Sequence, residues 1–498
     1  DNDYLSGGFY YYNQKIANER VDFGFEPMKN FIWNISGKYD QKLPFLTELA
    51  NSIPLVETNK VSNIFIEGEY ATVNPNPNPI GEAFLDDFES SKRTSSPSIM
   101  QRHWKKASVP ILDGSFLIQA DRGDLDWYNP FIDVSTQDIW PQQDVSTQAK
   151  NSTTKTLQLQ LNHSDQAMWS GVSTSLYSSD FDQSQSKYLD IWINADSVED
   201  DNLILNIDIG YISEDMNGNG TLDTEDEDIY GPGLGDGILD DSEDIGLDGC
   251  VDQFEDGVGG CLIEPNSEYT QGDDPNNDNW SYEQYSDDYS QINGTEGNGL
   301  STDYRYPDTE DLDNDKSLDT INDYFTYSLN LSNDPNLENQ TYDENGDPTG
   351  WKLYRILLSN FLKVSESADP SIDWDDVRSM RLWTNYDSSN ELSFSGNNLL
   401  KIAKVELVGN EWKELGVSSI NQISEDDFDS EASDFAITVI NTQDNSNYEE
   451  PPGVLGEYDE INNIREKEQS LVLDFYPVSD QLGGIDSDEV IAIKKVLT

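Results

Sequence analysis

The sequence predicts a mainly β protein, built around a jelly-roll-like antiparallel β-sandwich with a long acidic insertion that carries calcium loops. Seven segments alternate apolar and polar residues with a period of two, which is typical of antiparallel strands with one buried face. The chain also contains 11 Trp, 25 Tyr and 18 Phe, and such residues bury large areas in sheets. No Lys or Arg occurs from Tyr188 to Tyr304. The acidic part of this stretch, from 213 on, falls between the predicted strands 203–209 and 324–331 and is therefore an insertion.

Length and charge limit the possible functions. A chain of 498 residues is long enough for more than one hydrophobic core. The formal net charge of -68 argues against nucleic acid as a partner, because phosphates repel such a surface. No apolar run reaches the roughly 18 residues of a transmembrane helix, and no signal peptide is recognisable. Since the chain starts at Asp1 and ends in an unfinished strand pattern, we expect an internal fragment of a larger protein.

Residues 1–79 are expected to form β segments. Strands are predicted at 31–39 and 64–70, and a short helix at 43–50, where Pro44 suits the first helical turn. The alternating Asn and Pro residues of 74–79 are expected to lie outside any sheet or helix, because proline lacks a backbone donor. This run therefore predicts a linker at the end of the first domain.

Residues 80–412 are expected to form the sandwich, with the acidic insertion at 213–323. The seven alternating segments make two packed antiparallel sheets; they are 157–161, 188–193, 203–209, 324–331, 351–356, 378–383 and 399–407. Four tryptophans in or beside them are expected to pack in the core rather than to form a sugar-stacking surface, namely Trp192, Trp351, Trp383 and Trp412.

Residues 413–498 are expected to form a separate small β-containing unit. Strands are predicted at 435–440 and 469–475, with a loop at 449–453 between them.

A calcium loop is predicted at the start of the insertion. Calcium takes six to eight oxygen ligands, and alternate side chains on a tight loop deliver them to one centre. The loop has candidate ligands at positions 1, 3, 5, 7, 9 and 12, with Gly220 at the turn; they are Asp215, Asn217, Asn219, Thr221 through its carbonyl, Asp223 and Asp226. The alternative is an acidic turn without an ion.

A second calcium loop is predicted at the end of the insertion. It repeats the alternation of carboxylates but has Lys316 in place of the turn glycine; its candidate ligands are Asp311, Asp313, Asp315 and Asp319. Acidic turns at 236–244 and 273–278 could add ligands, although such turns also arise from composition alone.

Chemistry other than metal binding has little support in the sequence. The two histidines, His103 and His163, do not have the spacing of a metal-ligand pair, and no phosphate loop or nucleophile elbow occurs. We therefore expect a protein that is not an enzyme. The two cysteines, Cys250 and Cys261, are either a loop-closing disulfide or free thiols.

Several motifs, in this order along the chain, resemble the SprA (Sov) family, the outer-membrane translocons of the type IX secretion system that are also tied to gliding motility. The motifs lie at 26–33, 43–45, 62–70, 83–92, 243–249, 323–325 and 405–412. The resemblance implies a segment of a giant outer-membrane export channel, located at the outer membrane or cell surface, with residues 1–40 adjoining a barrel wall. It implies as partners the rest of the barrel, accessory secretion subunits and exported proteins. The alternative is a calcium-dependent carbohydrate-binding or adhesion module.

Overall fold

The structure is a computed structural model, and the description below covers the following residues: 3–14, 28–76, 92–141, 152–162, 168–198, 203–226, 237–240, 242–257, 259–300, 306–343, 345–367, 370–386, 398–410, 412–419, 435–441, 448, 458–459, 464–465, 469–475 and 489–495. The chain forms two compact units. Unit 1 comprises Asp1–Asp87 and Glu449–Glu457, and unit 2 comprises Phe88–Tyr448 and Tyr458–Thr498. Each unit is described separately.

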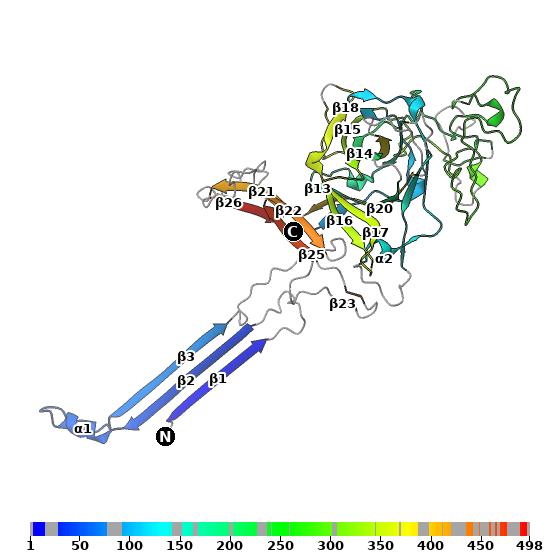
Figure 1. Ribbon diagram of the computed structural model, residues 1–498. Coiled ribbons are helices and arrows are strands. Elements are labelled where there is room, and N and C mark those ends of the chain that lie inside the picture. The colour runs from blue at the N-terminus through cyan, green and yellow to red at the C-terminus, as the bar shows by residue number, and fades with distance from the viewer. Residues whose placement is uncertain are drawn as a thin grey trace. The chain divides into compact units, whose positions relative to one another are not determined.

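Unit 1 is a three-stranded antiparallel sheet of long strands (Figure 1). Its strands are β1 (Tyr4–Gln14), β2 (Met28–Lys42) and β3 (Asn63–Asn76), paired in that order. The helix α1 (Pro44–Asn51) joins β2 to β3 and begins with proline in its first turn, as the sequence predicts. Both predicted strands are confirmed, and each is longer than its apolar segment.

The Asn-Pro run does not behave as predicted over its first three residues. Asn74, Pro75 and Asn76 continue β3 and pair with Phe31, Asn30 and Lys29. The prediction was wrong here because β3 is an edge strand of this sheet. A proline is tolerated at an edge, since its side without a donor can face away from the partner strand. Residues 77–79 lie outside the described part.

One face of the unit 1 sheet is mostly apolar, and the other mixes polar side chains with apolar ones such as Tyr10, Ile32 and Val73. The register places side chains opposite one another as Phe9 with Trp33 and Ile35 with Tyr70, and alternation along each strand adds further apolar residues to this mostly apolar face. These are Leu5, Tyr11, Phe31, Tyr39, Ile64 and Ile66. No described side chain of unit 1 is buried. The sheet therefore presents an amphipathic surface without a core of its own.

Unit 2 contains the predicted sandwich of two antiparallel sheets. The seven-stranded sheet has the order β16 (Leu337–Tyr342), β17 (Pro348–Leu357), β13 (Ser186–Ser197), β20 (Asn398–Asn410), β11 (Leu157–Asn162) and β8 (Asp124–Tyr128), with β4 (Lys92–Ser95) also paired to β20. The six-stranded sheet has the order β18 (Leu362–Ser365), β15 (Asp323–Asn330), β14 (Leu203–Tyr211), β19 (Ser379–Tyr386), β12 (Trp169–Ser175) and β5 (Lys105–Lys106). All seven predicted strands are confirmed, and the mainly β, jelly-roll-like fold class is correct.

The core lies between the two sheets and follows the alternation in the sequence. Leu157, Leu159 and Leu161 of β11 and Leu205 and Ile207 of β14 are almost completely buried in one apolar cluster. Successive side chains of a strand point to opposite faces of its sheet, so the odd-numbered residues of these strands fill the interior. Fully burying an aliphatic side chain of this kind contributes roughly 1.5 to 3 kcal/mol.

Three of the four tryptophans expected in the core are buried. Trp192 and Trp351 belong to a second apolar cluster with Ile139, which lies in the short helix α2 (Thr136–Ile139). Trp383 is 2% exposed and donates its indole N–H to Asp208. The side chain of Trp412 lies outside the described part of the chain.

A buried ion pair stands on the outer face of the six-stranded sheet. Arg381 and Asp208 are both fully buried, with 2.7 Å between nitrogen and oxygen. The carboxylate also accepts hydrogen bonds from Thr326 (2.6 Å) and Trp383 (2.9 Å). Arg381 further donates to Ser108, whose hydroxyl reaches the carbonyl of Ser213 at the start of the insertion. The pair thus links the sheet to the segments that cover it.

The remaining elements of unit 2 are short pairs. Near the sandwich, β6 (Ile111–Leu112) pairs with β7 (Ser115–Phe116), and β9 (Val134–Ser135) with β10 (Thr153–Thr154). Toward the C-terminus, β21 (Trp412–Ser419) pairs with β26 (Glu489–Lys495), β22 (Phe435–Asn441) with β25 (Gln469–Phe475), and β23 (Tyr458–Asp459) with β24 (Ile464–Arg465). The predicted strands at 435–440 and 469–475 are confirmed and pair with each other; the loop at 449–453 lies outside the described residues.

The acidic insertion connects β14 to β15 and consists of turns and loops in its described residues. Two short 3-10 helices occur in it, at Asp252–Phe254 and Asn298–Leu300, and it is the green, largely irregular part of the chain in Figure 1. Among the described helices, none is both long and apolar enough to cross a membrane.

Candidate metal loops and a cavity in the acidic insertion

The first predicted calcium loop is folded around the carboxylate of Asp215. Its Oδ1 accepts the backbone N–H groups of Gly218 (2.6 Å) and Asn219 (3.1 Å), and its Oδ2 accepts that of Gly220 (2.9 Å). Gly218 and Gly220 have φ angles of 78° and 73°, a left-handed conformation that costs little without a Cβ atom. The turn that the sequence assigns to Gly220 is therefore present.

Most of the predicted ligands of this loop lie in one hydrogen-bonded set. The amides of Asn217 (2.6 Å) and Asn219 (2.9 Å) both donate to Oδ2 of Asp223. Thr221 donates its backbone N–H and its hydroxyl to Oδ1 of Asn219, both at 2.6 Å. Asp226 differs, because its two carboxylate oxygens accept the N–H of Gly237, so it interacts with a later turn.

The second predicted loop repeats the geometry of the first. Oδ1 of Asp311 accepts the N–H groups of Asn314 (2.6 Å) and Asp315 (3.2 Å), and Oδ2 accepts that of Lys316 (2.7 Å). Asn314 and Lys316 have φ angles of 62° and 68°. The loop thus takes the same conformation although it has no glycine at the turn.

Carboxylate oxygens also gather at this second loop. Those of Asp311 and Asp313 lie within 4.8 Å of each other and of the carboxylate of Glu214. Asp315 accepts the backbone N–H and the hydroxyl of Ser317, at 2.8 and 2.6 Å. Asp319 contributes its backbone N–H to Glu214 (3.1 Å). Of the four predicted residues, Asp311 and Asp313 are therefore grouped, and Glu214 joins them although the loop pattern did not include it.

Each loop is braced by the glutamate that precedes the other loop. Glu310 accepts the N–H groups of Met216 (2.8 Å) and Asp223 (3.2 Å) in the first loop. Glu214 accepts those of Leu312 (2.8 Å) and Asp319 (3.1 Å) in the second loop. The two loops therefore form a reciprocal pair, although they are far apart in the sequence.

The two bracing glutamates are buried. Glu214 is 5% exposed and Glu310 is 1% exposed. Burial raises the pKa of each carboxyl to about 7, because a charged group is disfavoured away from water. The sequence contained a signal for these glutamates, since a glutamate directly precedes the first aspartate of each loop, in Glu214-Asp215 and Glu310-Asp311.

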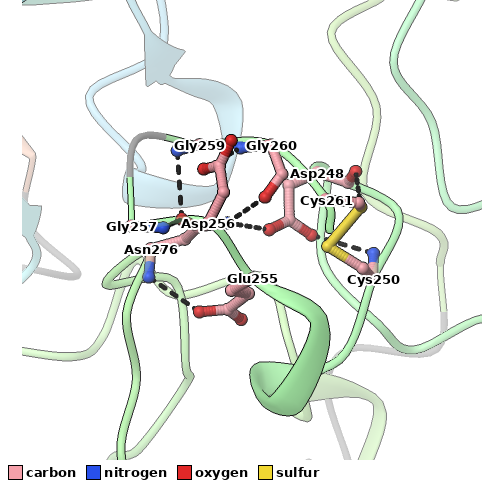
Figure 2. Close-up of a disulfide and its surroundings, with 9 residues drawn as sticks. All are labelled: Asp248, Cys250, Glu255, Asp256, Gly257, Gly259, Gly260, Cys261 and Asn276. Carbon is pink, nitrogen blue, oxygen red and sulfur yellow. Dashed lines mark hydrogen bonds between the residues drawn. A yellow bond between two sulfur atoms is a disulfide. The ribbon is translucent and has the colours of Figure 1, made fainter. Parts of the chain in front are cut away.

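The cysteines form a disulfide between Cys250 and Cys261 (Figure 2). It closes a short loop of the insertion that includes Glu255. Cross-linking a loop of this size removes freedom from the unfolded chain and stabilises the fold by roughly 3 kcal/mol. Of the two alternatives left open by the sequence, the structure has the disulfide.

A cavity of about 430 Å³ lies where the insertion meets the sandwich. Residues of both parts line it, among them Trp127 and Lys106 from the sandwich and Asn217 and Trp280 from the insertion. Both tryptophans are partly exposed. A volume of this size suits a small ligand, and aromatic faces with a few polar groups are the usual lining of such sites.

Two basic side chains hold the wall of the cavity together. Lys105 donates to the carbonyls of Thr309 and Asp311, both at 2.6 Å. Arg122 donates to the carbonyls of Ala107 (2.7 Å) and Met216 (2.6 Å) and lies over the ring of Trp169. The insertion is therefore attached to the sandwich through its backbone, at both calcium-type loops.

Comparison with known proteins gives little further information. No family model matches the chain, and no curated protein matches it. Among solved structures, the chain is similar to a family 11 carbohydrate-binding module from Clostridium thermocellum in complex with a beta-1,3-1,4-mixed-linked tetrasaccharide, at 9% identity and a TM-score of 0.25 over 64% of this chain and 95% of that chain. It is also similar to the family 11 carbohydrate-binding module of a cellulosomal cellulase of the same organism, at 10% identity and a TM-score of 0.22 over 67% and 96% of the two chains. With scores this low, the likeness says nothing about the ligand of this chain.

Proposed function

We propose that this chain is a non-enzymatic segment of an outer-membrane protein-export channel of the type IX secretion kind, with a calcium-stabilised insertion. The observation that carries the proposal is the sheet of unit 1. Its strands of 11, 15 and 14 residues exceed the roughly 9 to 11 residues that a tilted strand needs to cross a bilayer. Its apolar face contains Phe9, Trp33 and Tyr70, and none of these three side chains is buried.

The two faces of the sheet suit two different surroundings. The face opposite to Phe9 and Trp33 is the more polar one: it contains Asn34, Ser36 and Lys38 from β2, beside the apolar Tyr10, Ile32 and Val73. Alternation of this kind is typical of membrane strands that contact lipid on one side and an aqueous lumen on the other. The motifs that resemble the SprA family support the same proposal, as does the lack of any catalytic constellation in the sequence.

The test uses single cysteines on neighbouring positions of β2 in the intact cell-envelope protein. Ile35→Cys lies on the apolar face and Ser36→Cys on the polar face, and the native cysteines are held in a disulfide. A water-soluble maleimide is expected to label Ser36→Cys and to leave Ile35→Cys unlabelled until the membrane is dissolved in detergent. Equal labelling of both positions in intact membranes would contradict the proposal.

A carbohydrate-binding or adhesion role is a second candidate, and the cavity favours it. Trp127 and Trp280 are among the residues that line the cavity, together with the polar Asn217 and Lys106. Sugars bind to such combinations of an aromatic surface with a few polar groups. On a glycan array, Trp280→Ala is expected to abolish binding, whereas Tyr285→Ala, an exposed aromatic of the same insertion, leaves it unchanged. A wild-type chain that binds no glycan would eliminate this candidate.

A further inference from the structure

A second acidic cluster lies in the insertion and contains none of the ten predicted ligands. It contains two groups of three carboxylates that share Glu255, and in each group the oxygens lie within 4.8 Å of one another. One group adds Asp248 and Asp278 to Glu255, and the other adds Asp252 and Asp274. Figure 2 shows Asp248 and Glu255 beside the disulfide.

Glu255 is buried with an oxygen that has no partner. The residue is 0% exposed, and its Oε1 makes no hydrogen bond to any residue that the structure describes. Its Oε2 accepts the N–H of Asn276 at 2.7 Å. A buried carboxylate oxygen without a donor is costly, and a bound cation would remove that cost. Oδ1 of Asp278 and Oε2 of Glu296 are also buried without a partner.

The structure of the neighbouring loop explains why this oxygen is free. Asp274 accepts the N–H groups of Asp278 (3.0 Å) and Asn279 (3.2 Å), at the fourth and fifth positions after it, as Asp215 does in the first calcium-type loop. In that loop the residue after the aspartate, Met216, donates its N–H to the bracing glutamate. The corresponding residue here is Pro275, which has no N–H to donate.

The stretch that contains the cluster has no basic side chain of its own, because Lys and Arg are missing from Tyr188 to Tyr304. From the sandwich, Lys106 acts on Asp278 electrostatically, which supplies a single positive charge. The negative charge gathered here therefore exceeds what the described side chains balance.

We infer that Asp248, Asp252, Glu255, Asp274 and Asp278 form a calcium centre, in which Glu255 is the shared ligand. The donors are all hard carboxylate oxygens on irregular loops, which suits the large and flexible coordination sphere of calcium. Zinc is a poor fit, because the cluster has no histidine and the nearby cysteines are joined in a disulfide. Asn276 donates to Asp248 and Asn279 to Asp252 (2.7 Å), which orients both carboxylates.

The test compares three forms of the full chain after removal of metal with a chelator. Glu255→Gln keeps the shape and the acceptor for Asn276 but removes the charge. Glu268→Gln changes an exposed glutamate of the same insertion and is the matched control. Calcium is titrated into each form by calorimetry, and hydrogen exchange is followed across 248–279 with and without calcium.

Wild type and Glu268→Gln are expected to gain protection across 248–279 when calcium is added. Glu255→Gln is expected to show no such gain and to bind at least one calcium ion fewer per chain. Unchanged stoichiometry and unchanged protection in Glu255→Gln would overturn the inference. If Glu255→Gln does not fold, the wild-type chain still tests the inference. The inference is overturned if calcium does not change the protection of 248–279 in the wild type. The double variant Asp215→Asn, Asp311→Asn separates this centre from the predicted loops, because it is expected to retain the calcium response of 248–279.

Discussion

Because each bracing glutamate holds the loop that is distant from it in sequence, its removal should affect that distant loop and not the adjacent one. Glu310→Ala is expected to loosen the first loop, 215–223, and to leave the second loop, 311–319, in place, although Glu310 is adjacent to the second loop in sequence. The reason is that Glu310 accepts two N–H groups of the first loop, from Met216 and Asp223. Glu214→Ala is expected to have the opposite effect.

The size of the effect follows from the bonds that are lost. A hydrogen bond to a charged group contributes about 1.5 to 3 kcal/mol, and Glu310 is 1% exposed, so water does not readily replace it. Losing two such bonds costs roughly 3 kcal/mol at the lower limit, which corresponds to roughly hundredfold faster local exchange.

Hydrogen exchange with mass spectrometry measures this directly, at saturating calcium and with Glu268→Ala as an exposed control. The thermal unfolding of the sandwich should stay unchanged, because no bracing glutamate belongs to its core. The reasoning would be refuted if Glu310→Ala loosened 311–319 and left 215–223 protected, or if both loops exchanged equally fast.

Three other perturbations test the fold and the insertion. Asp208→Asn is expected to destabilise the sandwich by about 3 to 5 kcal/mol in urea unfolding, because it leaves Arg381 buried without its counter-charge. The control Asp133→Asn removes a more exposed pair with Lys155 and should cost less than about 1 kcal/mol. Equal losses of stability in the two variants would contradict the argument. Burial raises the pKa of Asp126 to about 7, so the sandwich should lose stability as the pH rises from the ordinary carboxyl range through 7. Asp126→Asn should therefore raise the melting temperature at pH 8 and change it little at pH 4, and a gain of the same size at both pH values would count against this. Removing calcium is expected to expand 213–323 while the sandwich stays folded, which hydrogen exchange can follow; unchanged protection across 215–226 would refute it.

Much of the sandwich could be predicted because its signal is local. Leu157, Leu159 and Leu161 alternate with polar residues in one short segment, and a strand that buries one face requires that alternation. Strand β12 (Trp169–Ser175) was not predicted because it lacks this alternation of apolar and polar residues. It is buried on both faces and consists mainly of small and polar residues. Its place in the sheet comes from pairing with β19 on one edge and β5 on the other, which are segments far from it in the sequence.

The metal-binding chemistry of the insertion could be predicted only in part. The spacing of Asp215, Asn217 and Asn219 indicates a calcium loop because all ligands come from one short segment. Glu255 had no such signal, since its partners Asp274 and Asp278 come from a different segment. Lys316, which replaces the turn glycine, argued against a calcium loop. The second loop nevertheless reaches the left-handed conformation at this position without glycine.

By itself, the sequence determined the β class, the position of most strands, the place of the insertion and the two loops that resemble calcium sites. All of these depend on residues that are neighbours along the chain. The tertiary structure alone decided which glutamate braces which loop, how the carboxylates gather around Glu255, and where the cavity forms between insertion and sandwich. Such contacts join segments far apart in sequence, and their geometry follows from the packing of the sheets.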